Sequence, residues 1–236
     1  MTPVIVSVGS FLAAELERMT PRPEWRKATR NMIMGTLSID RALADLQIDR
    51  ADCALVLGSM SGELETSSEF LTSWSRQKLA RPILFQNSLH NATTGFASIH
   101  FGFTGPTLSV SSFENTPRES LALGMAMLES CRFSVVTLVE GHRHMAKLID
   151  VQVTEGAVTA VLCAEETARE MSLPILRECR DFEWAGSYPV ERQGIPLLIP
   201  EYSQQFTQGT EPIPIIPSLI HFAQDQRIWI GDQVFR

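Results

Sequence analysis

The sequence predicts an α/β protein in which a sheet is covered by helices and is followed by an extended carboxy-terminal segment. Along residues 1–166, short apolar runs alternate with longer stretches in which apolar residues recur every three or four positions. The first pattern is typical of buried strands and the second of helices that pack on a sheet. Six of the 13 prolines lie between Pro189 and Pro217, and proline can neither donate to a sheet ladder nor sit inside a helix. The chain therefore divides into a first domain, residues 1–166, and a proline-rich extension, residues 167–236, that we expect to pack on it.

Strands are expected where a short apolar run is bounded by glycine, proline or polar residues. The first such run, residues 4–8, ends at Gly9. Glu155 and Gly156 separate two later runs and predict a hairpin turn. The predicted strands are residues 4–8, 52–58, 107–112, 134–139, 151–154, 157–163 and 228–230, and residues 82–85 are expected to be a further short extended segment.

Helices are expected where the apolar period is 3.6 residues. Met32, Ile39 and Leu43 lie on one helical stripe, which predicts a helix that packs on the sheet. A run of small residues, 92–98, would let another backbone come close to a helix at that position. Residues 102–106 have the composition of a turn. The predicted helices are residues 29–46, 67–79 and 120–129.

Composition narrows the function classes. A chain of 236 residues that is 44% hydrophobic and 20% charged fits a soluble globular protein with a sizeable core. The net charge of -7 argues against a general nucleic-acid binder, which needs a basic face. Apolar runs are too short for a membrane span, and the first residues lack the charged leader of a secretory signal. Four cysteines without close pairing favour reduced thiols and a cytoplasmic location.

No local motif assigns a reaction or a cofactor. In the run from Gly58 to Gly62 the central position of G-x-S-x-G is Met60, so the run is no nucleophile elbow. His142 and His144 follow a buried strand, but metal sites need three or four ligands, and we favour a solvated loop over a metal site. Neither glycine-rich phosphate-binding pattern is present. We therefore expect no metal and no cofactor.

Three stretches together resemble the amino-terminal half of β-ketoacyl synthases. They are LGSMSGEL at 57–64, FQNSLHNATTG at 85–95 continued by GFTGP at 102–106, and the strand, loop and helix of residues 107–140. The elements S-x-x-G-E-L and S-L-H-N-A resemble, more narrowly, the short ketosynthase-like subunits called chain length factors, with those of aryl polyene pigment clusters as the nearest type. The resemblance covers residues 1–165 and implies a thiolase-like fold, in which a mixed sheet is covered by helices.

The resemblance also implies that the catalytic groups are missing. In catalytic relatives the strand after the G-P pair ends at a nucleophilic cysteine, and the matching position here is Glu114, or a neighbour if the alignment shifts by one residue. The condensation needs a thiolate, which attacks an acyl thioester and then leaves again. The family's two catalytic histidines come from the carboxy-terminal half, where this chain has only His221. The resemblance therefore implies a subunit without a catalytic residue of its own.

What the resemblance implies instead is a partner. Relatives pair across the strand that precedes the nucleophile turn, here residues 107–112, with residues 91–103 beside it. A full-length ketosynthase would supply the cysteine and both histidines, and an acyl carrier protein would bring the substrate. Cations in the early loop could help this carrier to dock, although we favour a solvated loop. They are Arg22, Arg26, Lys27 and Arg30.

Aromatic side chains near that interface are candidates for lining an acyl tunnel, where a bulky ring limits chain length by excluded volume. Ordinary core packing explains them equally well. The tunnel and interface candidates are Phe96, Phe101, Phe103, Phe113, Glu114 and Asn115.

Two other functions stay open at this point. The chain could be a stand-alone acyl-thioester enzyme, a decarboxylase or transferase in which Glu114 is the base or acid, because burial raises the pKa of a carboxyl group. It could also be a homo-oligomeric scaffold without acyl chemistry. In each case the apolar surface of a half-fold has to be covered, so we expect an obligate or preferred oligomer.

Overall fold

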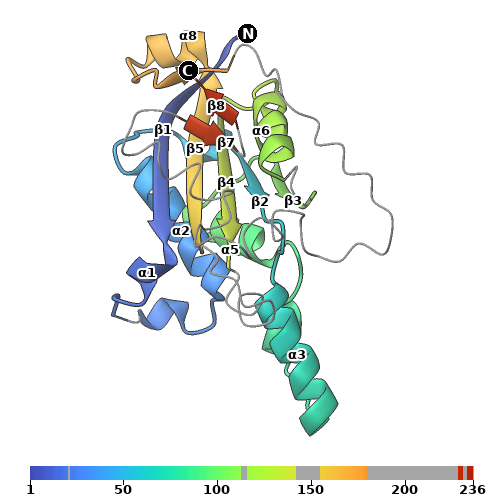
Figure 1. Ribbon diagram of the computed structural model, residues 1–236. Coiled ribbons are helices and arrows are strands. Elements are labelled where there is room, and N and C mark those ends of the chain that lie inside the picture. Colours follow the sequence, from blue (N-terminus) through green and yellow to red (C-terminus); the bar gives the residue numbers. More distant parts are fainter. Residues whose placement is uncertain (21, 113–115, 142–154, 180–227, 231–232, 236) are drawn as a thin grey trace, which may run out of the picture.

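A six-stranded sheet forms the centre of the structure (Figure 1). The computed structural model describes the chain except for residues 21, 113–115, 142–154, 180–227, 231–232 and 236. The strands of the sheet stand in the order β3-β2-β4-β5-β1-β6. Their bounds are Pro3–Leu12 (β1), Cys53–Gly58 (β2), Thr107–Val110 (β3), Phe133–Glu140 (β4), Gly156–Ala164 (β5) and Arg177–Glu178 (β6).

The sheet is mixed. Strand β2 is parallel to both of its neighbours, β3 and β4, whereas β5 and β1 run antiparallel to the strands beside them. A separate antiparallel pair is formed by β7 (Ile228–Ile230) and β8 (Gln233–Phe235). The predicted fold class, a mixed sheet with helices on its faces, is confirmed.

Helices cover both faces of the sheet because successive strand residues point to opposite sides. On one face Leu55 of β2 lies in a cluster with Ile39 of α2 and Phe101 of α5. On the other face its neighbour Val56 lies in a cluster with Leu121 of α6. The helices are α1 (Ala13–Leu16), α2 (Arg30–Leu43), α3 (Leu64–Gln77), α4 (Pro82–Asn87), α5 (Ala92–Phe101), α6 (Thr116–Met127) and α8 (Glu165–Glu170), with 3-10 turns at Pro23–Trp25 and Arg50–Asp52.

Helix α2 is fixed at its start and along its length. The hydroxyl of Thr29 accepts a hydrogen bond from the Met32 amide at 3.2 Å, which satisfies one amide of the first turn. Further along, α2 crosses β1 so closely at Gly9 that a Cβ atom there would overlap the backbone of Ser38 and Ala42. The absence of a side chain at Gly9 thus lets α2 lie directly on the sheet.

Most of the predicted elements are confirmed, with shifted ends. The strand predicted at 4–8 continues to Leu12, and the helix predicted at 120–129 begins at Thr116. The extended segment predicted at 82–85 is wrong, because these residues form α4. Pro82 occupies the first turn of α4, where its missing amide hydrogen costs nothing and its fixed φ angle suits the helix.

Several predictions lie outside the described residues. They concern the strand at 151–154, the histidine pair at 142 and 144, and most of the proline-rich extension. The division of the chain near residue 166 stays a prediction.

Candidate functional site

The carboxyl ends of three parallel strands meet at one end of the sheet. Gly58, the last residue of β2, pairs with Val110 of β3 on one side and with Leu138 of β4 on the other. Polar side chains gather at these ends: Ser59, Ser61 and Glu63 after β2, residues 111–112 after β3, and Glu140 as the last residue of β4. Crevices at the carboxyl ends of parallel strands are the usual place for sites in such sheets. This end of the sheet is therefore the candidate site.

Glu140 ties these strand ends together, although only 3% of its surface is exposed. Its carboxylate accepts hydrogen bonds from the backbone amides of Met60 and Ser61, the second at 3.3 Å. The hydroxyls of Ser61 and Ser59 also donate to it, at 2.8 Å and 3.4 Å. The hydroxyl of Ser111 in turn donates to the Met60 carbonyl at 3.3 Å. One buried carboxylate thus holds the turn after β2 in place.

Helix α6 begins beside the same turn. The Ser112 amide donates to the hydroxyl of Thr116 at 2.8 Å, and the Ser112 hydroxyl donates to Glu119 at 2.9 Å. The side chain of Ser120 packs so closely on Gly58 that a Cβ atom at Gly58 would overlap it. The position that the resemblance assigns to a nucleophile, Glu114, lies outside the described residues together with Phe113 and Asn115. The described residues on either side, Ser112 and Thr116, lie at the Glu140 end of the sheet.

The four cysteines lie away from this end. In the sheet register Cys53 pairs with Phe133, which pairs with Cys163, so both thiols sit at the opposite end of β2 and β4. Five steps at about 3.3 Å separate Cys53 from Gly58, which is about 17 Å. Burial raises the pKa of Cys53 to about 12 and the pKa values of Cys163 and Cys179 to about 11. None of these three buried thiols is poised to form a thiolate near neutral pH.

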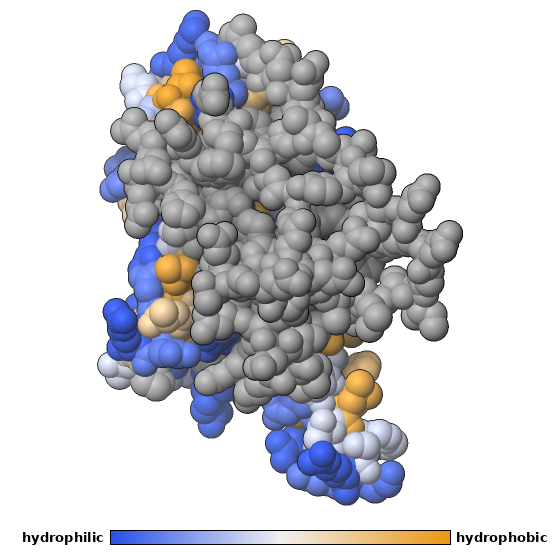
Figure 2. Space-filling view, viewed as in Figure 1, coloured by the Kyte–Doolittle hydropathy of each residue, from blue (hydrophilic) through white to orange (hydrophobic). Residues whose placement is uncertain are grey.

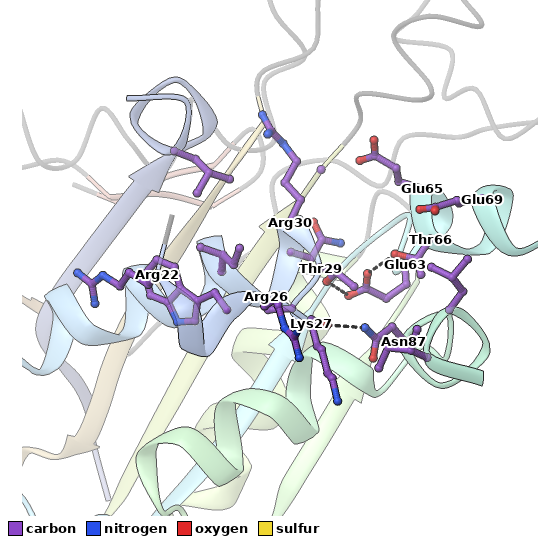
Figure 3. A pocket seen from close by; sticks show the side chains of 18 of the residues that line it. Arg22, Arg26, Lys27, Thr29, Arg30, Glu63, Glu65, Thr66, Glu69 and Asn87 are labelled. Carbon is purple, nitrogen blue, oxygen red and sulfur yellow. Dashed lines mark hydrogen bonds between the residues drawn. The ribbon is translucent and has the colours of Figure 1, made fainter. Parts of the chain in front are cut away.

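A cavity of about 610 Å³ lies beside the turn after β2. Figure 3 shows it between the loop before α2, the first turns of α2 and α3, and α4. Its size is within the range of small-molecule pockets. The labelled side chains are basic on the loop before α2 and acidic on α3 (Figure 3). They are Arg22, Arg26, Lys27 and Arg30 on the first wall and Glu63, Glu65 and Glu69 on the second.

Glu63 is the buried group of this cavity, with 5% of its surface exposed. Hydroxyls from three helical regions donate to its carboxylate: Thr29 at 3.2 Å, Thr66 at 3.4 Å, and Thr93. Burial raises the pKa of Glu63, and the three hydroxyls oppose this shift only in part. The amide group of Asn31 donates to the Gly62 carbonyl at 2.7 Å and closes the turn against α2. Glu63 therefore joins the starts of α2, α3 and α5.

The early-loop cations fall into two kinds. Arg30 is half-buried and paired with Glu155 at 2.8 Å, and Arg22 lies over the ring of Trp25, with 4.5 Å between the guanidinium carbon and the ring centroid. Arg26 and Lys27 are exposed. Arg22 is exposed as well, so three of the four cations fit the solvated loop that the sequence favours, and Arg30 does not.

The structure packs the tunnel candidates of α5 and of the turn after it mainly into the core. Phe101 and Phe103 are buried in the cluster under α2 and α5, and their ring centroids are 5.7 Å apart. Phe96 is partly buried and packs on a second cluster that contains Trp25 and Leu57. This is the packing that the core alternative predicts for Phe101 and Phe103, and a tunnel role for the set stays a prediction.

One edge of the sheet and the helices beyond it expose apolar surface. Strand β3 ends the sheet on this side and pairs with no strand of the described residues other than β2. Ile99 of α5 is 85% exposed. Figure 2 shows a small apolar patch among mostly hydrophilic residues at the lower right, where α3 projects. The exposed large apolar residues of α3, α4 and their flanks are Leu71, Trp74, Leu79, Ile83, Phe85 and Leu89.

Two classes of site find no support within the described part of the chain. No helix there is long and apolar enough to cross a membrane. No three His, Cys, Asp or Glu side chains of the described residues gather as metal ligands would. His142 and His144 lie outside those residues, so their predicted place in a loop stays untested.

The residues that sequence reasoning missed are Glu63 and Glu140. Glu63 stands in the G-E-L element and Glu140 ends an apolar strand, but neither was assigned a role. A single acidic residue directly after a fully buried strand is the signal that could have found Glu140, because a carboxylate there has to meet donors from the neighbouring strand ends.

The sequence matches the family model described as "Beta-ketoacyl synthase, N-terminal domain" over residues 30–172, which is more than half of the chain. The chain belongs to this family. The resemblance to β-ketoacyl synthases is thereby confirmed. No curated protein sequence matches the chain.

Solved structures of ketosynthases share the fold. The structure titled "The ishigamide ketosynthase/chain length factor" matches with a TM-score of 0.62 at 15% identity, over 75% of this chain and 65% of that one. The ketosynthase ApeO in complex with its chain length factor ApeC from Xenorhabdus doucetiae matches with a TM-score of 0.57 at 19% identity, over 69% and 79%. AntDE:AntF, a type II acyl-carrier protein in complex with its ketosynthase, matches with a TM-score of 0.63 at 10% identity, over 75% and 61%.

Identities this low show the shared thiolase-like fold and nothing finer. This chain spans less than two thirds of the ishigamide and AntDE chains that it matches.

Proposed function

We propose that this protein is a non-catalytic, chain-length-factor-like subunit that pairs with a full-length β-ketoacyl-acyl-carrier-protein synthase. The observation that supports it most directly is the position of the thiols. The family fold is present, but Cys53 and Cys163 lie at the wrong end of the sheet, about 17 Å from the strand ends where a nucleophile would stand.

A carboxylate at that position could not replace the thiolate. Acyl transfer to Glu114 would give a mixed anhydride, whereas a thiolate gives a thioester that both forms and breaks readily. The subunit therefore borrows the cysteine and the two histidines of its partner. A stand-alone enzyme that uses Glu114, or a homo-oligomeric scaffold, would be seen as an alternative outcome of the experiment below.

The edge of the sheet at β3 suits such a pairing. An edge strand offers unpaired backbone groups to another chain, and natural proteins rarely leave such an edge beside a large apolar surface. Here the edge lies beside α5, which exposes Ile99, and α5 in turn contacts α4, which lies against α3; both of these helices expose apolar residues. We propose that a ketosynthase adds to this edge and covers that surface, so that the sheet continues across the two subunits.

The finer assignments belong to the same proposal. The heterodimer acts in the cytoplasm in type II polyketide or fatty acid synthesis of the aryl polyene kind. Phe96 and Phe113 shape the acyl tunnel of the partner, with Phe101 and Phe103 as further candidates. The acyl carrier protein docks mainly on the ketosynthase, and the exposed Arg26 and Lys27 are the early-loop cations of this subunit that assist it. The extension beyond residue 166 packs on the first domain.

Co-expression with the ketosynthase encoded nearest to this gene tests the proposal. We expect the two proteins to co-purify through a tag on either one, and condensation of malonyl-loaded carrier protein to be lost when this subunit is omitted. Turnover by the isolated chain that disappears in Glu114→Ala would instead support the stand-alone enzyme. A stable homo-oligomer that does not bind the ketosynthase would support the scaffold.

A matched pair of surface variants locates the interface. Ile99→Glu places a charge on α5 beside β3 and should abolish co-purification. Leu176→Glu places the same charge on a side chain that is 43% exposed at the opposite edge of the sheet, before β6, and should leave it intact. Equal binding by both variants would place the interface elsewhere.

A further inference from the structure

The turn after β2 has the geometry of an anion-binding site, and a side chain of the chain itself occupies it. Four donors converge on one carboxylate: the amides of Met60 and Ser61 and the hydroxyls of Ser59 and Ser61. Successive backbone amides that point into one concavity favour a negatively charged ligand. The carboxylate in this concavity belongs to Glu140, eighty residues further along the chain.

The sheet register brings Glu140 to this turn. Gly58 pairs with Leu138, so the residues after Gly58 are level with Val139 and Glu140. Side chains alternate along a strand, and Glu140 therefore shares a face with Leu138, which packs in the cluster under α6. The carboxylate thus lies on the α6 side of the sheet, at the end where the Ser112 amide donates to the hydroxyl of Thr116 at the start of that helix.

We propose that residues 59–61 form an anion-binding cradle for a small carboxylate or oxyanion, and that Glu140 is its built-in occupant. The cradle, once emptied, accepts an external monocarboxylate of the size of formate or acetate. Glu140 acts here as a positioning residue, because it fixes the turn after β2 against the ends of β3 and β4.

The consequence for function rests on the proposed non-catalytic role. Donors that could stabilise the oxyanion of an acyl thioester are already engaged at the end of the sheet where relatives carry their nucleophile. A carboxylate of the same chain competes at very high effective concentration with any substrate oxygen. The occupied cradle would keep this subunit's own site closed while its partner works.

Glutamine cannot replace Glu140 in this cradle. The Met60 amide donates to Oε1 and the Ser61 amide donates to Oε2. In Glu140→Gln one of these oxygens becomes an NH₂ group, which has no lone pair to offer. A hydroxyl can rotate to accept from this group, but a backbone amide cannot, so one of the two amides loses its acceptor in either orientation of the side chain.

Chemical rescue in the full-length chain tests the cradle. We expect Glu140→Ala to lower the melting temperature and to speed hydrogen exchange at Met60 and Ser61 by about ten- to a hundredfold, as for buried amides that lose their acceptor. Formate or acetate, at ionic strength held constant with chloride, should restore both in a saturable way. The triple variant Ser59→Ala, Ser61→Ala, Glu140→Ala should lose most of this response.

Glu119→Ala is the matched control, since Glu119 is an exposed carboxylate that also accepts from a serine, Ser112. It should show no response to formate. The proposal is overturned if formate acts equally on Glu140→Ala, on Glu119→Ala and on the triple variant, or if Met60 and Ser61 exchange no faster without Glu140.

If Glu140→Ala yields no folded protein, Glu140→Gln decides. The cradle predicts faster exchange at Met60 or Ser61 with no effect of formate, because the amide side chain still fills the space. Unchanged exchange in Glu140→Gln would overturn it. These measurements use the subunit alone, so a negative result overturns the cradle but not the proposed pairing with a ketosynthase. A failed co-purification, in turn, overturns the pairing but not the cradle.

Discussion

Substitutions at two residues of α5 test whether Phe101 is a core residue. Ile99 and Phe101 lie two positions apart on different faces of the helix, so that Ile99 is exposed and Phe101 is buried. Phe101 is 6% exposed, its ring is edge-on to His100 with centroids 4.9 Å apart, and the Cζ atom of Arg50 lies 5.4 Å from its centroid. Truncating such a buried ring costs about 3–5 kcal/mol through lost burial and the cavity left behind. Phe101→Ala should therefore lower the free energy of unfolding by about that amount, and the melting temperature by about 2–4 °C per kcal/mol.

Urea unfolding of the full chain, followed by circular dichroism, measures this cost, with Ile99→Ala as the control. Removal of the exposed Ile99 side chain should change stability by less than about 0.5 kcal/mol. Because Phe101→Ala uses a large share of a typical total of about 5–15 kcal/mol, the milder Phe101→Leu should be measured beside it.

The same variants decide between the core and the tunnel. If Phe101 is a core residue, Phe101→Leu in complex with the ketosynthase should give products of unchanged length per folded complex. A cost below about 1 kcal/mol for Phe101→Ala, together with longer products, would refute the core assignment and make the ring a wall of the acyl tunnel.

Three further outcomes are expected. Glu63→Gln should raise the melting temperature at neutral pH, because burial raises the pKa of Glu63 and its ionised form therefore destabilises the fold. The contribution of Glu63 to stability is full below its ordinary pKa of 4.5 and is lost as pH rises. The gain from glutamine should therefore vanish toward acid pH in a series of thermal melts. Gly9→Ala should lower the free energy of unfolding in urea by at least about 1–3 kcal/mol, because the new Cβ atom meets the backbone of α2, with Ala42 Cα at 3.0 Å. Gly95→Ala on α5 should raise it by about 0.4–1 kcal/mol, because a Cβ atom there has no neighbour within 4 Å. Iodoacetamide should label the partly exposed Cys131 first, and mass spectrometry should find the three buried thiols alkylated only after denaturation.

Local pattern predicted the strands that are buried on both faces. Strand β2 is a continuous apolar run and β4 is mostly apolar, and every residue of both strands is buried, as in a strand covered on both faces. Strand β1 shows why ends are harder to predict. Gly9 was interpreted as the end of the strand, but β1 continues to Leu12, because the glycine serves the close crossing of α2 rather than a turn.

Residues 82–85 show a second limit. An apolar run that follows a proline is compatible with an extended segment, yet Pro82 also suits the first turn of a helix. The choice between the two depends on packing: α4 lies against α3, and Phe85 contacts Phe70 of α3 with ring centroids 5.6 Å apart. A contact between residues fifteen positions apart leaves no trace in the local period of the sequence.

The roles of the two acidic residues of the candidate site could not be predicted either, because their hydrogen-bond partners lie even further away in the sequence. Glu63 meets Thr29 and Thr93, which are 34 and 30 residues away, and Glu140 meets Ser61 at a separation of 79. In each case the sequence shows an ordinary glutamate: helix packing brings the donors to Glu63, and the sheet register brings them to Glu140.

Both carboxylates also bear on how such a subunit can act. Glu63 and Glu140 are each satisfied by hydroxyls or backbone amides of their own chain, so the carboxyl end of the sheet is filled from within. The β3 edge, in contrast, carries backbone groups and apolar side chains such as Ile99 that the described chain does not cover. A surface of this kind recruits another sheet more readily than a small substrate. If the subunit contributes to synthesis, its contribution should therefore pass through the sheet edge, and variants of that edge should impair activity in proportion to lost binding.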